Sequence, residues 1–339
     1  MDIFTTAVLA QVVANLKRPK LFLLNSFFKL EQRETTEEIH FEVEHGRRTI
    51  APFVSPLSAG KVIASEGSTV VSLQPAYVTT KTPFNADDAM RRAIGEQIGG
   101  VMSPEQRVQA NLARTLSDHV MQIDRRQEWM AARAMIDGKY TIVGEKYPAK
   151  LIDFQRDPAL RVVKGTGSKW SDNGVNPLDD LQDWALLVAQ KSGVYPSEVV
   201  MDPNAWKRFR DNPAVKERWN SLNGNISGLT PAAAGDGGKF MGSIDGFDIY
   251  TYADWYVDPV DDQEKPMLPV GSVLLSSADG LQGYRAFGVI RDEEAGFQPL
   301  PYFPKSWVEK DPSVRWLLTQ SAPLVVPYRI NASLSATVL

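Results

Sequence analysis

The chain of 339 residues contains no cysteine. This absence excludes a disulfide framework, a thiolate metal site and a cysteine nucleophile. Histidine is almost as scarce, with only His40, His45 and His119. His40 alternates with apolar neighbours, as the polar side of a strand would, and His119 lies inside a long helical pattern. We therefore expect surface or packing roles for these side chains rather than a histidine-based catalytic site.

The sequence also lacks an excess of positive charge and a long apolar run. Its 37 Lys and Arg against 41 Asp and Glu give a net charge of −4, so bulk charge does not predict binding to nucleic acid or to an anionic membrane. The apolar stretch Leu21–Phe28 is short, is interrupted by Asn25 and Ser26, and has no small-residue cleavage site. We therefore expect neither secretion nor membrane insertion, and a product that stays in the cytosol.

Glycine and proline are absent from residues 105–137, which form the longest unbroken pattern in the chain. Ser103 can cap a helix, Pro104 suits its first position, and Gln106 completes a capping box. Gly138 can end the helix in a left-handed conformation. The apolar positions of one face are Val108, Leu112, Leu116, Val120, Ile123, Met130 and Ala134. We predict a continuous spine helix over about 104–137, roughly 50 Å long.

The hydrophobic period changes to two before this helix. Apolar and polar residues alternate over 37–44, which predicts a half-buried strand. The segments Thr49–Ala64 and Thr69–Thr80 are then predicted to be two arms of an extended hairpin. These arms carry few large side chains, so an isolated hairpin would be only marginally stable in water. We therefore expect the arms to lie on another subunit. Pro75 and Pro83 would interrupt continuous pairing and guard an exposed edge.

The chain after the spine alternates strand and helix signals, which is α/β in character. Strands are predicted over 138–143 and 149–154, then a helix capped by Asn176, a buried strand over 199–201 and a helix that opens at Asp202-Pro203. Residues 221–242 are polar and glycine-rich, which predicts a loop. Further strands are predicted over 246–254, 273–276, 284–290, 307–308 and 316–326, so the tail is rich in β-structure.

Each candidate motif for chemistry has a structural explanation that fits it better. Gly165-Thr166-Gly167 lacks the third glycine of a dinucleotide-binding loop, and Gly238-Lys239 is followed by Phe240 where a P-loop needs Ser or Thr. The acidic stretch 258–264 lacks the spacing of an EF-hand. Asp179 and Asp180, near Asp183, lie where a helix N-terminus favours negative charge. We therefore predict no catalytic, cofactor-binding or metal-binding residues and no enzymatic activity.

Short segments along nearly the whole chain share their order and spacing with one known family. They are Thr5-Thr6-Ala7, Leu21-Phe22-Leu23, Val54-Ser55-Pro56, Tyr77-Val78, Arg91-Arg92, Gly138-Lys139-Tyr140-Thr141, Gly144-Glu145, Trp170-Ser171, Asp202-Pro203, Trp206, Phe209-Arg210, Ala214-Val215-Lys216-Glu217, Pro304-Lys305, Trp307-Val308, Asp311-Pro312 and Gln320-Ser321-Ala322-Pro323-Leu324. In these segments the chain resembles the major capsid protein of lambda-like tailed bacteriophages, the coat protein E family.

The resemblance implies an α+β fold of the Hong Kong 97 capsid type. It predicts five units: an amino-terminal arm (1–36), an extended β-hairpin loop with its flanking strand (37–88), a peripheral domain with the spine helix (89–154), an axial α/β domain (155–300) and carboxy-terminal strands that return to the peripheral and axial sheets (301–339). No cofactor is implied. Some relatives carry covalent Lys–Asn crosslinks, but no residue set here predicts them.

The function implied by the resemblance is structural. Pentamers and hexamers of the chain would close into the icosahedral head of a tailed phage around double-stranded DNA, and the shell would expand during packaging. The chain would be a virion protein assembled in the host cytoplasm. Its partners would be itself and the scaffolding, portal and decoration proteins, without sequence-specific DNA binding and without a membrane. One alternative is an encapsulin-like nanocompartment shell, and another is a carboxylate-dependent cytosolic hydrolase.

Two apolar or extended regions are candidates for the contact between subunits. The apolar run in the arm needs cover, which a neighbouring subunit could provide as readily as the chain's own core. The hairpin is expected to reach across to the next copy. The predicted interface residues are Phe22, Phe27, Phe28, Lys61, Ile63, Glu66, Val71, Leu73 and Tyr77.

Overall fold

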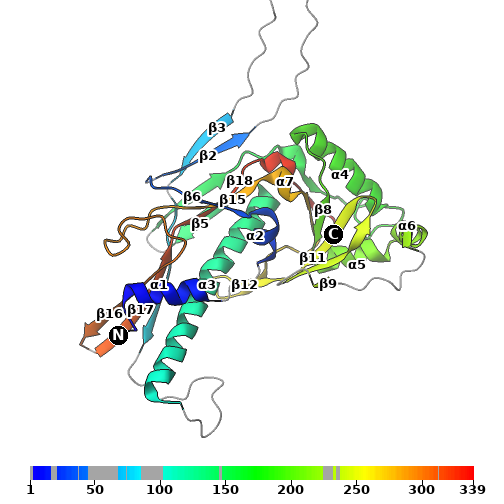
Figure 1. The fold of residues 1–339 in the computed structure, drawn as a ribbon. Coiled ribbons are helices and arrows are strands. Elements are labelled where there is room, and N and C mark those ends of the chain that lie inside the picture. The colour runs from blue at the N-terminus through cyan, green and yellow to red at the C-terminus, as the bar shows by residue number, and fades with distance from the viewer. Residues whose placement is uncertain are drawn as a thin grey trace, which may run out of the picture.

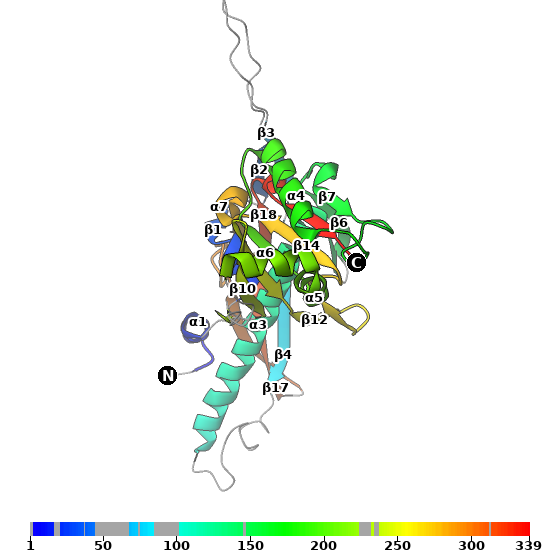
Figure 2. The same ribbon diagram turned by 90° about the vertical axis from the view of Figure 1, so that its right-hand side faces the viewer.

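A computed structural model of the chain describes residues 3–16, 21–36, 38–44, 68–73, 75–84, 102–144, 147–223, 232–233, 237–311 and 313–339. These residues form a mixed α+β structure, as predicted. Figures 1 and 2 show one long helix that leaves the main body and continues beside a small sheet.

The predicted spine is one helix, α3, over Pro104–Asp137. Ser103 Oγ accepts a hydrogen bond from the Gln106 N–H at 3.3 Å, and Gln106 Oε1 accepts one from the Ser103 N–H at 2.9 Å. The capping box therefore satisfies two N–H groups at the helix start. Gly138 ends the helix at a φ of 69°, where an added Cβ would lie 2.8 Å from Arg156 Cβ. Both ends are as predicted.

Helix α3 passes through two hydrophobic cores. Its first half packs on α1 (Thr6–Asn15), β4 (Val78–Phe84) and β17 (Ser313–Ser321), and Leu116 is fully buried there. Its second half enters the main core and contacts α2 (Phe22–Phe27) and β18 (Pro323–Pro327). The helix therefore joins the amino-terminal arm to the carboxy-terminal strands.

A seven-stranded sheet forms most of the main body. Its order is β7 (Arg161–Val163), β19 (Leu334–Thr337), β14 (Ser272–Ser276), β8 (Glu198–Met201), β11 (Phe247–Tyr252), β10 (Gly238–Ile244) and β9 (Ala232–Ala233). The helices packed on one face are α4 (Pro177–Ser192), α5 (Pro203–Asp211) and α6 (Pro213–Asn223). Val199 and Met201 face these helices, whereas Val200 faces the core around α3, as the two-residue period of a strand requires.

The strand pairing before the spine differs from the prediction. The arm predicted over Thr69–Thr80 is divided between β3 (Ser68–Leu73) and β4, which belong to different sheets. Strand β3 pairs with β2 (Ile39–Glu44). The predicted arm over 49–64 lies outside the described residues. Pro75 lies at the break and is buried, and its ring packs so closely on Gly288 that a Cβ added to the glycine would lie 2.3 Å from it.

Strand β4 completes a three-stranded antiparallel sheet at its edge. The sheet order is β16 (Phe303–Lys310), β17 and β4, so residues more than 200 positions apart are paired. Pro83 lies in this edge strand opposite Trp316, where its missing N–H can face away from the sheet. His119 of α3 bridges the two strands, with Nε2 at 2.8 Å from Thr82 Oγ1 and Nδ1 at 3.1 Å from Thr319 Oγ1.

Two further predicted segments have different bounds in the structure. The predicted strand over 316–326 is two strands, β17 and β18, which separate at Ala322 because Pro323 begins the second in another sheet. The predicted loop over 221–242 is shorter, since α6 continues to Asn223 and β10 begins at Gly238. The strands predicted over 199–201 and 246–254 are confirmed as β8 and β11.

The remaining elements complete smaller sheets and connections. They are β1 (Leu30–Arg33), which is parallel to β15 (Gly283–Phe287); the hairpins β5 (Lys139–Gly144) with β6 (Tyr147–Asp153) and β12 (Trp255–Val257) with β13 (Glu264–Pro266); the short helix α7 (Ala278–Leu281); and the 3-10 turns η2 (Pro158–Leu160) and η4 (Ile330–Ala332). Strands from 301–339 join three sheets, and the five-unit division of the chain stays a prediction.

The continuity of α3 can be tested at Leu116, which is fully buried in the core shared with α1, β4 and β17. Leu116→Ala should lower the free energy of unfolding by about 2–5 kcal/mol through lost packing. Leu116→Pro should lower it by about 3 kcal/mol more, because proline also breaks the helix hydrogen bonding. Urea denaturation of the purified subunits measures both. Equal stabilities for the two variants would show that the helix is not continuous at this position.

Candidate functional site

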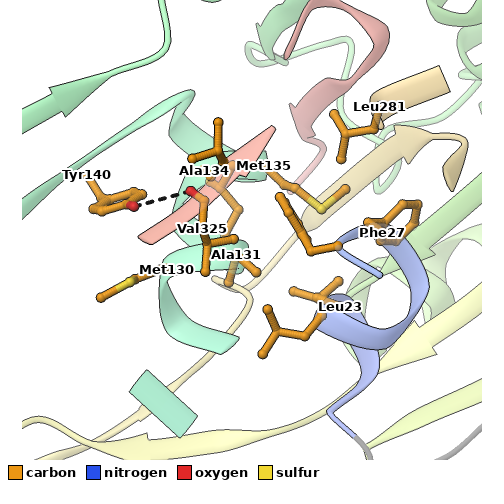
Figure 3. Close-up of a cluster of buried hydrophobic side chains, with 14 of the residues drawn as sticks. Leu23, Phe27, Met130, Ala131, Ala134, Met135, Tyr140, Leu281 and Val325 are labelled. Carbon is orange, nitrogen blue, oxygen red and sulfur yellow. Dashed lines mark hydrogen bonds between the residues drawn. The ribbon is translucent and has the colours of Figure 1, made fainter. Parts of the chain in front are cut away.

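The three arm phenylalanines predicted to contact another subunit are buried inside their own chain. Phe22, Phe27 and Phe28 are exposed by only 5%, 2% and 0%. They belong to the main core with α3, and Figure 3 shows Leu23 and Phe27 pointing toward Met135 and Leu281. The intersubunit assignment of these three residues is therefore wrong. The run folds as the short helix α2 and fills the space between α3 and the sheets.

Two glycines make this position possible. A Cβ at Gly238 would lie 2.3 Å from the Phe22 ring, and one at Gly283 would lie 2.5 Å from the Phe28 ring. The phenylalanine rings can therefore rest directly on the backbone of β10 and β15. The Phe22 ring also stacks on Tyr252 at a centroid distance of 5.4 Å. Apolar content alone predicts that these residues need cover, but it does not identify which surface provides it.

Of the other six predicted interface residues, three lie outside the described residues and three lie within them. Lys61, Ile63 and Glu66 lie outside the described residues. Val71 and Leu73 lie in β3, in register with Phe41 and Ile39 of β2. Tyr77 follows β3 and is 38% exposed, but its hydroxyl donates to the Val289 carbonyl at 2.6 Å and accepts from the Arg291 N–H at 3.0 Å. These contacts fix Tyr77 within its own subunit and leave its ring partly accessible.

The candidate motifs for chemistry at Asp180, 165–167 and 258–264 have structural roles. Asp180, near the start of α4, accepts from Lys164 Nζ at 2.6 Å and from Trp170 Nε1 at 2.9 Å. The Gly167 N–H donates to Asp172 Oδ2 at 2.8 Å, so the glycine-rich turn binds a carboxylate of its own chain. The acidic stretch is the turn between β12 and β13, where Lys265 pairs with Asp258 and Asp261 at 2.6 Å each.

The described residues contain neither a metal-binding cluster of side chains nor a membrane-spanning helix. No group of three or more His, Asp or Glu side chains there is arranged to hold a metal ion. Among the helices of this part of the chain, none is both long enough and apolar enough to cross a membrane.

A buried carboxylate on α3 fixes the position of the arm. Glu128 is fully buried, and its Oε1 accepts from the Leu23 N–H and from the Tyr252 hydroxyl, both at 2.8 Å. Its Oε2 accepts from the Leu24 N–H at 3.0 Å. The two N–H groups belong to the first turn of α2, where a helix leaves such donors unpaired. One side chain of the spine thus holds the arm and strand β11 together.

Burial raises the pKa of Glu128 from 4.5 to about 7. The N–H groups of Leu23 and Leu24 and the Tyr252 hydroxyl oppose this shift because they stabilise the charged form, whereas the nearby charge of Asp254 adds to it. Burial, followed by the charge of Glu128, raises the pKa of Tyr252 as well. The carboxyl that anchors the arm therefore changes protonation near neutral pH.

The outer face of α3 carries a groove that the sequence reasoning missed. It has a volume of about 450 Å³ and lies between α3, the start of β4 and β12. Trp129 is half-buried in it, with the Arg126 Cζ 5.3 Å and the Arg133 Cζ 6.0 Å from its ring centre. Such distances are typical of cation–π contacts. The sequence contains a signal for one wall of this groove, since Arg126, Trp129 and Arg133 recur at helical spacing. The other walls come from segments distant in the sequence, which this spacing does not identify.

The effect of Glu128 can be isolated with Glu128→Gln. An acid whose folded pKa exceeds its unfolded value binds more protons when folded, so its contribution to the free energy of unfolding falls as pH rises. The fall should reach about 3 kcal/mol between pH 4.5 and 7. The variant lacks this titration, so the stability of wild type relative to Glu128→Gln should decline over that window in urea denaturation.

A matched control is Glu105→Gln, which changes an exposed glutamate in the first turn of the same helix. Burial also lowers the pKa of His119, but this titration is present in wild type and both variants and cancels in the comparison. Parallel pH curves for wild type and Glu128→Gln would contradict the assignment of Glu128 as a titrating group.

The fold has counterparts among solved structures. The putative capsid protein of an Escherichia coli CFT073 prophage aligns with a TM-score of 0.75 at 20% identity, with 100% of both chains covered. The mature capsid of bacteriophage PhiM1 aligns with a TM-score of 0.53 at 10% identity, over 95% of this chain and 88% of that one. The fold is therefore the Hong Kong 97 type found in phage capsids, as predicted.

Sequence comparisons cover nearly the whole chain. The major capsid protein of Escherichia phage lambda is 30% identical over 336 residues, which cover 96% of each chain. That of Escherichia phage N15 is also 30% identical, over 337 residues and 96% of each chain. Residues 5–338 match the family described as phage major capsid protein E. This chain therefore belongs to the phage major capsid protein E family.

Proposed function

We propose that copies of this chain assemble as pentamers and hexamers into the icosahedral head of a tailed bacteriophage, which encloses double-stranded DNA. The observation that carries the proposal is the family match over residues 5–338, together with 30% identity to the lambda major capsid protein over 96% of both chains. In this role the chain is a structural component of the virion and has no enzymatic activity.

The arrangement of the subunit supports this role. Helix α3 and the β16–β17–β4 sheet extend away from the seven-stranded sheet, so the chain presents separate surfaces at its two ends (Figures 1 and 2). Separate, dissimilar surfaces favour head-to-tail contacts between identical subunits, which close into rings when the rotation allows it. Rings of five and six subunits are the units from which a closed shell is built.

The charge of the chain is consistent with a container for DNA. At a net charge of −4 the wall does not bind the phosphate backbone through bulk attraction. DNA driven in by a motor needs no such attraction, and a strongly basic wall would oppose its release. The proposal extends to the partners that build such heads, which are scaffolding, portal and decoration proteins, and to expansion of the shell during packaging.

Electron microscopy of the purified protein tests the proposal against its two alternatives. We expect closed icosahedral shells, and shells that contain DNA when the protein is isolated from lysates of phage-producing cells. Shells filled with a protein cargo would instead indicate an encapsulin-like compartment. A small discrete oligomer with hydrolytic turnover would indicate the carboxylate-dependent enzyme, and would defeat both shell hypotheses.

The predicted loop between β2 and β3, residues 45–67, is proposed to contact a neighbouring subunit. Lys61, Ile63 and Glu66 belong to this loop, and Val71 and Leu73 lie in the strand that follows it. The described strands close at the pair Glu44 and Ser68, so the segment 45–67 connects a regular antiparallel hairpin. A contact made by this segment should be removable without disturbing the hairpin or the cores.

The test replaces residues 45–67 with Asn-Gly, a two-residue turn that suits antiparallel strands. We expect the circular dichroism spectrum and melting temperature of the dissociated subunit to stay close to those of wild type, because both cores remain. Assembly measured by sedimentation should be lost. As a control, the same segment is replaced by a glycine-serine linker of equal length. This variant separates the effect of the length of the segment from the effect of its side-chain contacts. Normal shells from both variants would exclude an intersubunit role for this loop.

A further inference from the structure

The loop between β15 and β16 holds an aromatic side chain out into solvent. Phe297 is 62% exposed and has a φ of 54°, a left-handed backbone that favours Gly or Asn. The preceding Gly296 is also left-handed, at a φ of 63°. A large aromatic residue therefore occupies a strained backbone position and leaves most of its surface exposed. Strain of this kind points to a role for the side chain outside the subunit's own core.

The loop that carries Phe297 is rigidly built. Its inner side is anchored by Ile290 and Ala295, which are buried with Phe303 and Ala322. Lys305 Nζ lies 3.0 Å from Asp292 Oδ2, and Thr6 Oγ1 donates to Glu294 at 3.0 Å. These bonds tie the loop to β16 and α1, so the Phe297 ring is presented in a fixed position. A preorganised side chain loses little conformational freedom on binding.

The charge beside this ring is negative. Glu293 is exposed, and no ion pair involves it within the part of the chain that the structure describes. Asp292 and Glu294 add negative charge, although both are within reach of Lys305. The surface element formed by residues 292–298 is therefore an aromatic knob with an acidic edge.

The groove on α3 has the complementary chemistry. Trp129 and Tyr256 provide aromatic walls, and Arg125 and Arg126 provide positive charge. Arg126 lies near Asp258, but Arg125 is exposed and has no ion-pair partner among the described residues. A cavity of about 150 Å³ is enough to hold benzene, so a groove of about 450 Å³ has room for the Phe297 ring and neighbouring side chains.

The knob and the groove occupy different places in the subunit. In Figure 1 the brown loop between β15 and β16 lies at the left edge of the molecule, whereas β12 lies on the other side of α3. The knob is held by contacts with Lys305 and Thr6, and the groove by α3, β4 and β12. A knob and a groove at different places on identical chains form a head-to-tail contact, which is the type that closes rings.

We propose that the knob of residues 292–298 inserts Phe297 into the α3 groove of a second copy of this chain, with Glu293 facing Arg125. The proposal rests on the assembly function proposed above and assigns one of its contacts. The aromatic ring supplies the apolar anchor, and the charged pair fixes the orientation.

The absence of cysteine allows a direct test by crosslinking. In the variant Arg125→Cys/Glu293→Cys, a short bis-maleimide should join neighbouring subunits in assembled shells. A denaturing gel should show a ladder that ends at five and six subunits. Matched controls are the two single variants and Arg125→Cys/Glu217→Cys, in which the second cysteine is on an exposed position of α6. These controls should remain monomeric on the gel.

Two sets of variants test the contact energetically. Arg125→Glu and Glu293→Arg should each raise the concentration needed for assembly about tenfold, and the double reversal should restore it to within about threefold. Phe297→Asn should weaken assembly about tenfold while the dissociated subunit melts at the same or a higher temperature, because the strain is relieved. A residue with only an internal structural role would lower the melting temperature instead.

The outcomes separate this contact from the proposed function. Wild-type shells whose double-cysteine variant gives only monomers on the gel would overturn the contact and leave the assembly function intact. If the wild type forms no shells, the proposed function fails. The same crosslinking on concentrated soluble protein then decides the contact, because a gel with only monomers would overturn it as well.

Discussion

The contact on which the rest of the structure depends is the one between the Glu128 carboxylate and the first turn of α2. It places a charge-bearing group at the centre of the main core, where an unpaired carboxylate would be strongly unfavourable. Three donors from two distant segments make that position tolerable. Tyr252 also reaches Asp254 at 3.4 Å, but the N–H groups of Leu23 and Leu24 have no other acceptor among the described residues, so the arm and the spine satisfy these groups only when both are in place. A buried polar group of this kind favours one arrangement over others that are equally apolar.

The spine helix makes a second connection of this type in its first half. His119 bridges Thr82 of β4 and Thr319 of β17, which joins the segment before the spine to a strand near the carboxyl end. Leu116 provides the apolar packing at the same level. Helix α3 therefore works as a common support, because each of its halves combines a hydrophobic stripe with a buried polar side chain that contacts distant segments. This combination explains how a helix that extends beyond the main body keeps a defined position.

The sequence allowed accurate prediction where the determining signals are local. Both ends of α3 follow from Ser103, Gln106 and Gly138, residues that act within one turn of the helix end. Prediction failed where the partner is distant. Phe22 and Phe28 were assigned to a subunit contact because apolar content indicates burial without identifying the cover, and the glycines that receive them are more than 200 residues away. The α3 groove was missed for the same reason, since its walls come from three separate segments.

The burial of the arm phenylalanines changes how assembly must be understood. If those side chains needed a neighbour for cover, the subunit could not complete its main core before it joined a shell. Because they are covered internally, folding and assembly can be separate steps, and the surfaces left for assembly need to supply only the contact between finished subunits. Such a surface can be small and specific, with a few exposed anchors such as Phe297 and complementary charges rather than a broad apolar face. Weak individual contacts of this size also suit a closed shell, because many of them act together and single misplaced subunits can still dissociate.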